Sequence, residues 1–262
     1  ATPIITPWPV LPDIHVSCPG GNDGTARFFV RSGITAPYNY RIYRNETELV
    51  GEGTFSGNYV NSIPTTFVTP DNLRAGNYRL VVTDINGCET FKTADLFEPE
   101  PITMSFEVGN YNESNISCRG YSDGYVTATV EGGNGSYSYY WYPATGSLPV
   151  SNNTALLDSI PAGKYYLRIT DLLGCIEIDS VTLTDPPGMI LSGSNVSMSN
   201  DNAFNISCNG ASDGYISLEI TGGSGNYTYL WVGPGDFTAT TRDISNLKAG
   251  IYTCTVTDIN GC

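Results

Sequence analysis

The chain has few charged side chains, and positively charged ones are the scarcest. Only 12 of its 262 residues are lysine or arginine, against 26 aspartates and glutamates, which gives a formal net charge of −14. Because nucleic-acid binding relies on clustered basic residues to displace phosphate counterions, this composition excludes nucleic acid as a partner. An acidic, weakly charged surface is typical of an extracellular protein and is compatible with binding of divalent cations.

Long apolar runs, helical periodicity and catalytic side chains are also missing. No apolar run approaches the roughly 20 residues that cross a bilayer, so no membrane span is expected in this segment. The only histidine, His15, has no nucleophile recurring near it, and acidic pairs such as Glu98 and Glu100 flank a proline rather than a cleft. A zinc site needs four closely spaced ligands, and that spacing is absent. We therefore expect no catalytic residue, no enzyme activity and no resident cofactor, with calcium as the one open possibility.

Two phrases recur three times along the chain. The opening phrase C-x-G-x-[N/S]-D-G occupies residues 18–24, 118–124 and 208–214, and the closing phrase A-G-x-Y-x-x-x-x-T-D-x-x-G-C occupies residues 75–88, 162–175 and 249–262. A repeat of this length is too long for a solenoid unit and has the size of an autonomous domain. The sequence predicts three homologous modules: module 1 (residues 1–99), module 2 (residues 100–186) and module 3 (residues 187–262). Module 3 is expected to lack its last strand.

Each module reads as a series of short strands. Module 2 is the clearest, with alternating or β-rich segments expected as strands at residues 102–108, 124–131, 137–142, 155–160, 164–170 and 175–184. About seven short strands, with turn signals roughly every 10 residues, are typical of an immunoglobulin-like sandwich. Prolines stiffen both boundaries between modules. We predict an all-β fold: three tandem immunoglobulin-like β-sandwich modules in an elongated array.

The core positions align from module to module. One strand contributes a tyrosine and, two residues later, a larger apolar residue: Tyr40 and Ile42, Tyr139 and Trp141, Tyr229 and Trp231. The opposing strand contributes Leu80, Val82, Leu167, Ile169 and Val256. We expect these aromatics to be core rather than a ligand platform. Module 1 carries an insertion at about residues 44–70, expected as an added hairpin in which residues 48–50 lie opposite residues 59–60.

The two phrases, joined by the Gly-Gly and Tyr-x-Trp segments, closely resemble the SprB-type repeat. This family belongs to very large cell-surface adhesins of gliding Bacteroidetes, and its modules also look like PKD-type immunoglobulin-like domains. The resemblance covers nearly all of modules 2 and 3 and both ends of module 1. It implies extracellular display at the cell surface, type IX secretion, and a role in attachment or gliding motility. It carries over no catalytic residue.

Six of the seven cysteines fall at equivalent positions, two in each module, and predict disulfides formed in an oxidising compartment. They are Cys18, Cys88, Cys118, Cys175, Cys208 and Cys262. The seventh, Cys254, aligns with Leu80 and Leu167 and is expected to be a free, buried thiol.

Two disulfide arrangements are open. In the first, each module closes its own pair: Cys18–Cys88, Cys118–Cys175 and Cys208–Cys262. In an immunoglobulin-like sandwich, however, the opening and closing cysteines lie at opposite poles, about 25 Å apart, and bonded cysteines need Cα atoms within about 7 Å. Strand geometry therefore favours a cross-joint arrangement, Cys18–Cys175 and Cys118–Cys262, in which Cys88 and Cys208 serve neighbours outside this segment.

Aspartates within the two phrases are weak calcium candidates. Asp23, Asp123 and Asp213 precede a glycine, and a further aspartate ends each closing strand. Calcium takes six to eight oxygen ligands. Because no D-x-D-x-D-G loop is present and aspartate before glycine also sets a turn, we favour turns over metal ligands.

The sequence thus predicts a non-catalytic stalk or adhesive segment of a secreted bacterial surface adhesin, forming a filament. Its expected partners are surface glycans, other surface or substratum ligands, and neighbouring repeats. The alternative is a set of carbohydrate-binding or spacer modules of a secreted polysaccharide-degrading enzyme. Exposed coplanar rings of Tyr140 and Tyr142 beside Trp141 would favour the alternative, whereas a buried Trp141 would favour a strut.

Overall fold

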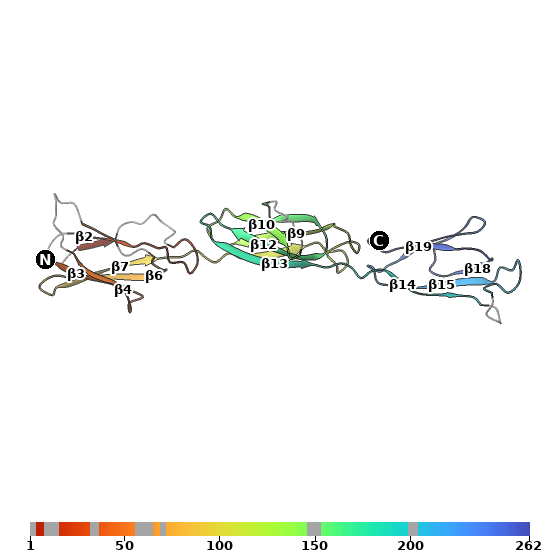
Figure 1. The fold of residues 1–262 in the computed structure, drawn as a ribbon, viewed down its shortest axis with the longest axis horizontal. Coiled ribbons are helices and arrows are strands. Elements are labelled where there is room, and N and C mark those ends of the chain that lie inside the picture. The colour runs from red at the N-terminus through yellow and green to blue at the C-terminus, as the bar shows by residue number, and fades with distance from the viewer. Residues whose placement is uncertain are drawn as a thin grey trace. The chain divides into compact units, whose positions relative to one another are not determined.

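The fold is known from a computed structural model. It describes residues 4–7, 16–31, 37–55, 65–68, 72–145, 153–198 and 204–262, and the insertion of module 1 falls partly outside these ranges. The regular structure of the described residues is entirely β-strand, β1 to β19 (Figure 1). No helix in this part of the chain is long and apolar enough to cross a membrane.

Module 1 contains two antiparallel sheets. One has the strand order β1-β2-β5 and the other the order β4-β3-β6-β7. The strands are β1 (Ile4–Pro7), β2 (Arg27–Arg31), β3 (Tyr38–Arg44), β4 (Glu48–Phe55), β5 (Thr65–Val68), β6 (Gly76–Thr83) and β7 (Glu89–Leu96).

Module 2 repeats this arrangement, with one strand fewer among its described residues. Its sheets have the orders β11-β9-β8 and β10-β12-β13. The strands are β8 (Thr103–Val108), β9 (Gly124–Glu131), β10 (Ser138–Pro143), β11 (Leu156–Ile160), β12 (Gly163–Thr170) and β13 (Ile176–Leu183). All six agree with the segments expected from the sequence to within one or two residues at each end.

Module 3 has the sheets β14-β15-β18 and β17-β16-β19. The strands are β14 (Ile190–Val196), β15 (Gly214–Thr221), β16 (Thr228–Gly233), β17 (Phe237–Ala239), β18 (Ile244–Leu247) and β19 (Thr253–Thr257). In immunoglobulin notation every module pairs strands A, B and E in one sheet and strands C and F in the other, and the fold class is confirmed. Strand G is β7 in module 1 and β13 in module 2.

The core of each module lies between its two sheets, because alternate residues of each strand point inward. In module 1, Phe28 of β2 is fully buried with Ile42 of β3 and Leu80 of β6. Trp141 and Leu167 are fully buried in module 2, and Trp231 is 2% exposed in module 3. The prediction that the Tyr-x-Trp strands supply core residues is confirmed.

One detail of the core differs from expectation: Cys254 is half-buried rather than buried. Residues 48–50 belong to β4, which pairs along its length with β3, from Arg44 opposite Glu48 to Tyr38 opposite Phe55. Their expected partners, residues 59–60, lie outside the described residues, so the added hairpin stays a prediction.

The chain divides into two compact units. Unit 1 consists of Ala1–Met104, Val130–Ser138 and Ile169–Glu177, and unit 2 consists of Ser105–Thr129, Tyr139–Arg168 and Ile178–Cys262. The border runs through module 2, and each unit unites part of module 2 with one flanking module. The boundaries of the three modules stay a prediction.

Candidate functional site

Two disulfides join successive modules. In unit 1, Cys18 of the first opening phrase is bonded to Cys175 of the second closing phrase, with Cα atoms 5.5 Å apart. In unit 2, Cys118 is bonded to Cys262 in the equivalent way, also with a Cα separation of 5.5 Å. These are the two pairs of the cross-joint arrangement. We call the residues around each disulfide joint 1 (Cys18–Cys175) and joint 2 (Cys118–Cys262).

The opening phrase builds a tight turn that presents its cysteine. The N–H three residues after each opening cysteine donates to that cysteine's carbonyl oxygen, as from Tyr121 to Cys118 at 2.9 Å. Of the two residues between them, the second adopts a positive φ, which is 81° at Gly120, and glycine does so without strain. This explains why a glycine follows each opening cysteine at the same spacing.

The aspartate of the opening phrase fastens this turn. Asp123 accepts the backbone N–H of Ser117 at 3.2 Å and also the Ser117 hydroxyl. Asp23 and Asp213 accept the N–H groups of Ser17 and Ser207 at 3.0 and 3.2 Å. Hydrogen bonds from these serines hold the pKa of Asp23 and of Asp213 below the usual 3.8. The weak calcium candidates are therefore turn-building residues, and calcium binding stays a prediction.

The closing phrase holds the second cysteine by a buried carboxylate. Asp171 is 6% exposed, and its Oδ1 accepts the N–H groups of Leu173 and Cys175, both at 2.9 Å. Burial acts to raise the pKa of Asp171, but these bonds and those from Asn134 outweigh it and keep the pKa below 3.8. Asp84 and Asp258 hold Cys88 and Cys262 in the same way.

An asparagine carboxamide crosses each joint beside the disulfide. In joint 1, Asn134 Nδ2 donates to the carbonyl oxygen of Ser17 at 2.9 Å. Asn134 stands in the loop between β9 and β10, and the equivalent loop position of module 3 is Ser224. In joint 2 the donor is instead Asn260 of the closing phrase, whose Nδ2 lies 3.1 Å from the carbonyl oxygen of Ser117.

The two joints therefore contain the same kind of hydrogen bond, but the asparagine that donates it stands at a different position in each module. Module 2 has Asn134 in its loop and Leu173 in its closing phrase, whereas module 3 has Ser224 and Asn260. Sequence reasoning missed both asparagines, because neither position is constant among the modules. The sequence signal that could have revealed them is that modules 2 and 3 each have an asparagine at one of these two positions and a different residue at the other.

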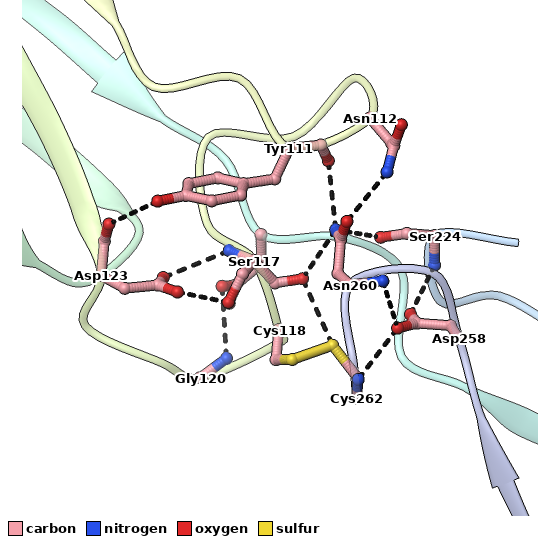
Figure 2. Close-up of a disulfide and its surroundings, with 11 residues drawn as sticks. Tyr111, Asn112, Ser117, Cys118, Gly120, Asp123, Ser224, Asp258, Asn260 and Cys262 are labelled. Carbon is pink, nitrogen blue, oxygen red and sulfur yellow. Dashed lines mark hydrogen bonds between the residues drawn. A yellow bond between two sulfur atoms is a disulfide. The ribbon is translucent and has the colours of Figure 1, made fainter.

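Joint 2 has the denser network (Figure 2). Asn260 Nδ2 also donates to Ser224 Oγ at 2.8 Å, and Asn260 Oδ1 accepts Asn112 Nδ2 at 2.8 Å. The disulfide sulfur of Cys262 lies 3.3 Å from the same Ser117 carbonyl oxygen that Asn260 bonds. A side chain from module 3 thus engages both a backbone carbonyl and a side chain of module 2.

The side chains of Tyr140, Trp141 and Tyr142 do not form the flat platform that would favour glycan binding. Trp141 is fully buried, and its Nε1–H donates to the carbonyl oxygen of Thr154 at 3.1 Å. Tyr140 is 40% exposed, but its ring is inclined by 41° to that of Tyr142. Tyr142 in turn stacks on Tyr166 at 5.3 Å between ring centroids. This arrangement supports the strut rather than the sugar-binding alternative.

The remaining candidate residues do not gather into a site. Cys88 and Cys208 are free and exposed, and Cys254 is free and half-buried. The described residues contain no group of three or more histidine, cysteine, aspartate or glutamate side chains placed to hold a metal ion. His15 lies outside the described residues.

The chain has low overall similarity to several solved structures. It is 14% identical to a structure concerned with host cell surface retention of a 1.5-MDa bacterial ice-binding adhesin, covering 100% of this chain and 94% of that chain with a TM-score of 0.44. It is 12% identical to a tetra-tandem repeat in the extending region of a large adhesion protein, covering 91% and 68% with a TM-score of 0.32. An amphioxus IgVJ-C2 molecule is 18% identical, covering 62% and 97% with a TM-score of 0.27.

No curated protein matches the chain. The SprB repeat family, however, matches it twice, at residues 110–146 and 200–236. Each match begins shortly before an opening phrase and ends after the Tyr-x-Trp strand, so it includes one half of a joint and part of the core. Segments of modules 2 and 3 thus match the SprB repeat, in agreement with the resemblance noted in the sequence.

Proposed function

We propose that this chain is a non-catalytic, force-bearing stalk segment of a secreted bacterial cell-surface adhesin. The SprB repeats and the disulfide-linked joints support a role outside the cytoplasm, since structural disulfides persist in oxidising compartments. Its function is to hold a binding surface away from the cell and to carry tension between the two. The partners that we propose are neighbouring repeats and surface glycans or other substratum ligands.

The observation that carries this proposal is the order of the bonded cysteines along the chain. Cys118 lies between the ends of the first disulfide, and Cys175 lies between the ends of the second. The two covalent loops are therefore interleaved. A pull on the ends takes the shortest covalent route, which runs from Cys18 to Cys175, back through module 2 to Cys118, and on to Cys262.

This route limits how far the chain can be extended. It contains roughly 75 residues, which span at most about 270 Å when fully extended, whereas the reduced chain of 262 residues would span about 940 Å. Most of modules 1 and 3 lies off the route and carries no tension while both bonds are intact. A stalk with this connectivity can unfold in part without lengthening several-fold.

Single-molecule force spectroscopy tests the proposal. Pulled by its ends, the oxidised chain is expected to reach a contour length near 270 Å, and reduction is expected to increase that length more than threefold. Cys175→Ser opens the first loop and should add about 150 Å, because the shortest route then runs from Cys18 to Cys118 along the chain.

Cys88→Ser is the matched control, since Cys88 is free in the structure. It should leave the contour length unchanged. Within-module disulfides would instead make Cys88→Ser add about 250 Å, and that result would refute the proposed force path.

We further propose that this segment is exported by type IX secretion and takes part in attachment or gliding. The resemblance to the SprB-type repeat and the two matches to that family support this role. Antibodies raised against residues 100–262 should label intact cells that carry the full protein and should impair their attachment or gliding. Label that appears only after the cells are permeabilised would argue against surface display.

A further inference from the structure

The two sheets of module 2 expose outer faces of opposite charge. Module 2 is rich in acidic residues, and its only basic residues are Arg119, Lys164 and Arg168. Lys164 and Arg168 both stand on β12, at exposed positions that alternate with the buried residues of that strand. Because side chains alternate along a strand, both lie on the outer face of the sheet β10-β12-β13.

Aromatic and apolar side chains accompany the two cations on this face. Tyr140 of β10 and Ile178 of β13 are 40% and 48% exposed. Tyr166 lies between Lys164 and Arg168 along β12, and Lys164 Nζ stands 5.0 Å from the centroid of its ring. These side chains all belong to unit 2. Together with Tyr142 they are called the basic face: Tyr140, Tyr142, Lys164, Tyr166, Arg168 and Ile178.

No acidic side chain pairs with these cations among the described residues. The strands β10 and β12 contain no aspartate or glutamate. On β13, Glu177 and Asp179 point to the same side as the buried Leu183, whereas Ile178 points to the other side. Neither cation of the basic face forms an ion pair with a described residue. The basic face thus combines exposed apolar area with positive charge on a chain whose net charge is −14.

The other sheet of module 2 has an outer face of opposite sign. Glu107 of β8 and Asp158 of β11 are exposed there, because their neighbours Phe106 and Leu157 point into the core. Tyr125, on the strand β9 between them, is 38% exposed. The strands β8, β9 and β11 contain no lysine or arginine. We call Glu107, Tyr125 and Asp158, all of unit 2, the acidic face.

The charges on the two faces have matching separations. Lys164 and Arg168 are four residues apart on one strand, which corresponds to about 13 Å. Glu107 and Asp158 stand on the two strands that flank β9, and the register of these strands offsets them by about two residues. Two strand spacings and this offset place them about 12 Å apart. Each cation of one copy can therefore meet one carboxylate of another copy.

We propose that the basic face of module 2 docks on the acidic face of module 2 in a second copy of the chain. The two cations of one copy pair with Glu107 and Asp158 of the other, and the exposed rings around them become covered. Tyrosine and arginine are enriched in protein interfaces, and complementary charge selects the partner. The matched spacing of the two charge pairs favours this partner over an acidic polysaccharide.

This contact joins separate molecules through their sheets and is distinct from the disulfide joints, so it goes beyond the stalk function proposed above. The cation pair lies along one strand and the carboxylate pair runs diagonally across three, so the strands of the two copies cross obliquely. Because the contact joins two different faces, each copy keeps one face of each kind for a further neighbour. The association is therefore open, and several stalks can share one load.

Sedimentation velocity on the full chain tests this proposal, with the disulfides intact and the free thiols alkylated so that no end-to-end bonds form. In about 0.15 M salt, which screens the repulsion between acidic chains, we expect self-association that grows with concentration. The cation-reversed variant, Lys164→Glu with Arg168→Glu, should associate at least about tenfold more weakly. Lys92→Glu with Lys248→Glu changes the net charge equally at exposed positions of modules 1 and 3, and should weaken association less than about twofold.

An acid-reversed variant, Glu107→Lys with Asp158→Lys, should also lose self-association. Mixed with the cation-reversed variant it should restore association, because each reversed face then meets a face of opposite sign. An unmodified chain that stays monomeric would overturn the proposal, and its retention on alginate beads through the two cations would then identify an acidic polysaccharide as the partner. A mixture of the two variants that does not associate would overturn it as well, since the acidic partner would then lie elsewhere.

Discussion

Asn260 lies across joint 2 with its carboxamide nitrogen 3.1 Å from the carbonyl oxygen of Ser117. The bond runs beside the Cys118–Cys262 disulfide and links the closing loop of module 3 to the opening loop of module 2 (Figure 2). In module 1 the equivalent closing residue is Asn86, which is exposed and whose carboxamide makes no hydrogen bond among the described residues. An asparagine at the same loop position therefore forms a side-chain hydrogen bond across the joint in module 3, whereas in module 1 its carboxamide makes no hydrogen bond to a described residue.

This pair gives a stability prediction with a built-in control. Asn260→Ala removes hydrogen bonds to Ser117 and Ser224 and leaves their acceptors in a partly covered joint, so we expect a loss of about 1–2 kcal/mol in the free energy of unfolding of module 3. Asn86→Ala should change stability by less than about 0.5 kcal/mol. Chemical denaturation monitored by the fluorescence of Trp231 measures the first effect. Equal losses in both variants would mean that the joint contact has no special role.

The disulfide pairs can be identified directly by peptide mapping under non-reducing conditions. We expect peptides that join Cys18 to Cys175 and Cys118 to Cys262, because in each pair the Cα atoms lie 5.5 Å apart, within the range that a disulfide requires. Alkylation before digestion should mark Cys88, Cys208 and Cys254 as free thiols. A peptide joining Cys118 to Cys175 would show that the modules close their own pairs.

Much of the fold follows from local sequence signals. The strands of module 2 were predictable because β-branched and aromatic residues alternate between turns rich in glycine, as in β9 (Gly124–Glu131). The buried positions of Trp141 and Leu167 followed from the period of two along a strand that is covered on one face.

The parts that were missed depend on contacts between distant segments. Cys254 was expected to be buried because it aligns with Leu167, which is fully buried, but it is half-buried. The alignment of one residue does not show how fully segments distant in the sequence cover it. The asparagine contacts of the joints could not be seen in one module alone, because Asn134 and Asn260 stand in different loops and perform the same task.

Acid should weaken joint 1 through Asp171. The pKa of this carboxylate is held below 3.8 by its hydrogen bonds from Asn134, Cys175 and Leu173, which outweigh its burial. A lowered pKa in the folded state means that the ionised form stabilises the fold above pH 3.8, and that this contribution is lost as the pH falls through the folded value. We expect the thermal midpoint of unit 1 to fall as the pH drops from about 5 to 3.

Asp171→Asn checks this assignment. The substitution places an amide NH₂ where Oδ2 now accepts the N–H and side chain of Asn134, so at pH 7 the midpoint should drop by about 5 °C or more. The difference from the unmodified chain should shrink on acidification, since the native carboxylate then becomes neutral too. Asp158→Asn, at an exposed position on β11, is the control and should behave as the unmodified chain does at every pH. A difference that stays constant with pH would rule out the carboxylate's charge as the cause.

Cys88 and Cys208 should be able to form a third joint between two molecules. Cys88 is held by Asp84 at 2.7 Å as Cys175 is held by Asp171, and the turn of Cys208 is fastened by Asp213 as that of Cys118 is by Asp123. Each is thus built as one half of a joint, and both are free and exposed.

Incubation of the concentrated chain in a glutathione redox buffer should therefore produce a ladder of head-to-tail, disulfide-linked oligomers on a non-reducing gel. Cys88→Ser and Cys208→Ser should each abolish the whole ladder, the head-to-tail dimer included, because one half of the third joint is then missing from every molecule. Mixing the two variants should restore a dimer that joins Cys208 of one molecule to Cys88 of the other. Cys254→Ser should leave the ladder unchanged, since burial raises the pKa of the Cys254 thiol and lowers its thiolate fraction. If any two exposed thiols could pair, each variant alone would form symmetric dimers, Cys208–Cys208 or Cys88–Cys88. The amount of these would equal the amount of mixed Cys208–Cys88 dimer that forms when the two variants are combined. The preference for the mixed pair therefore measures how much of the joint is specified by the loops around the cysteines rather than by the cysteines alone.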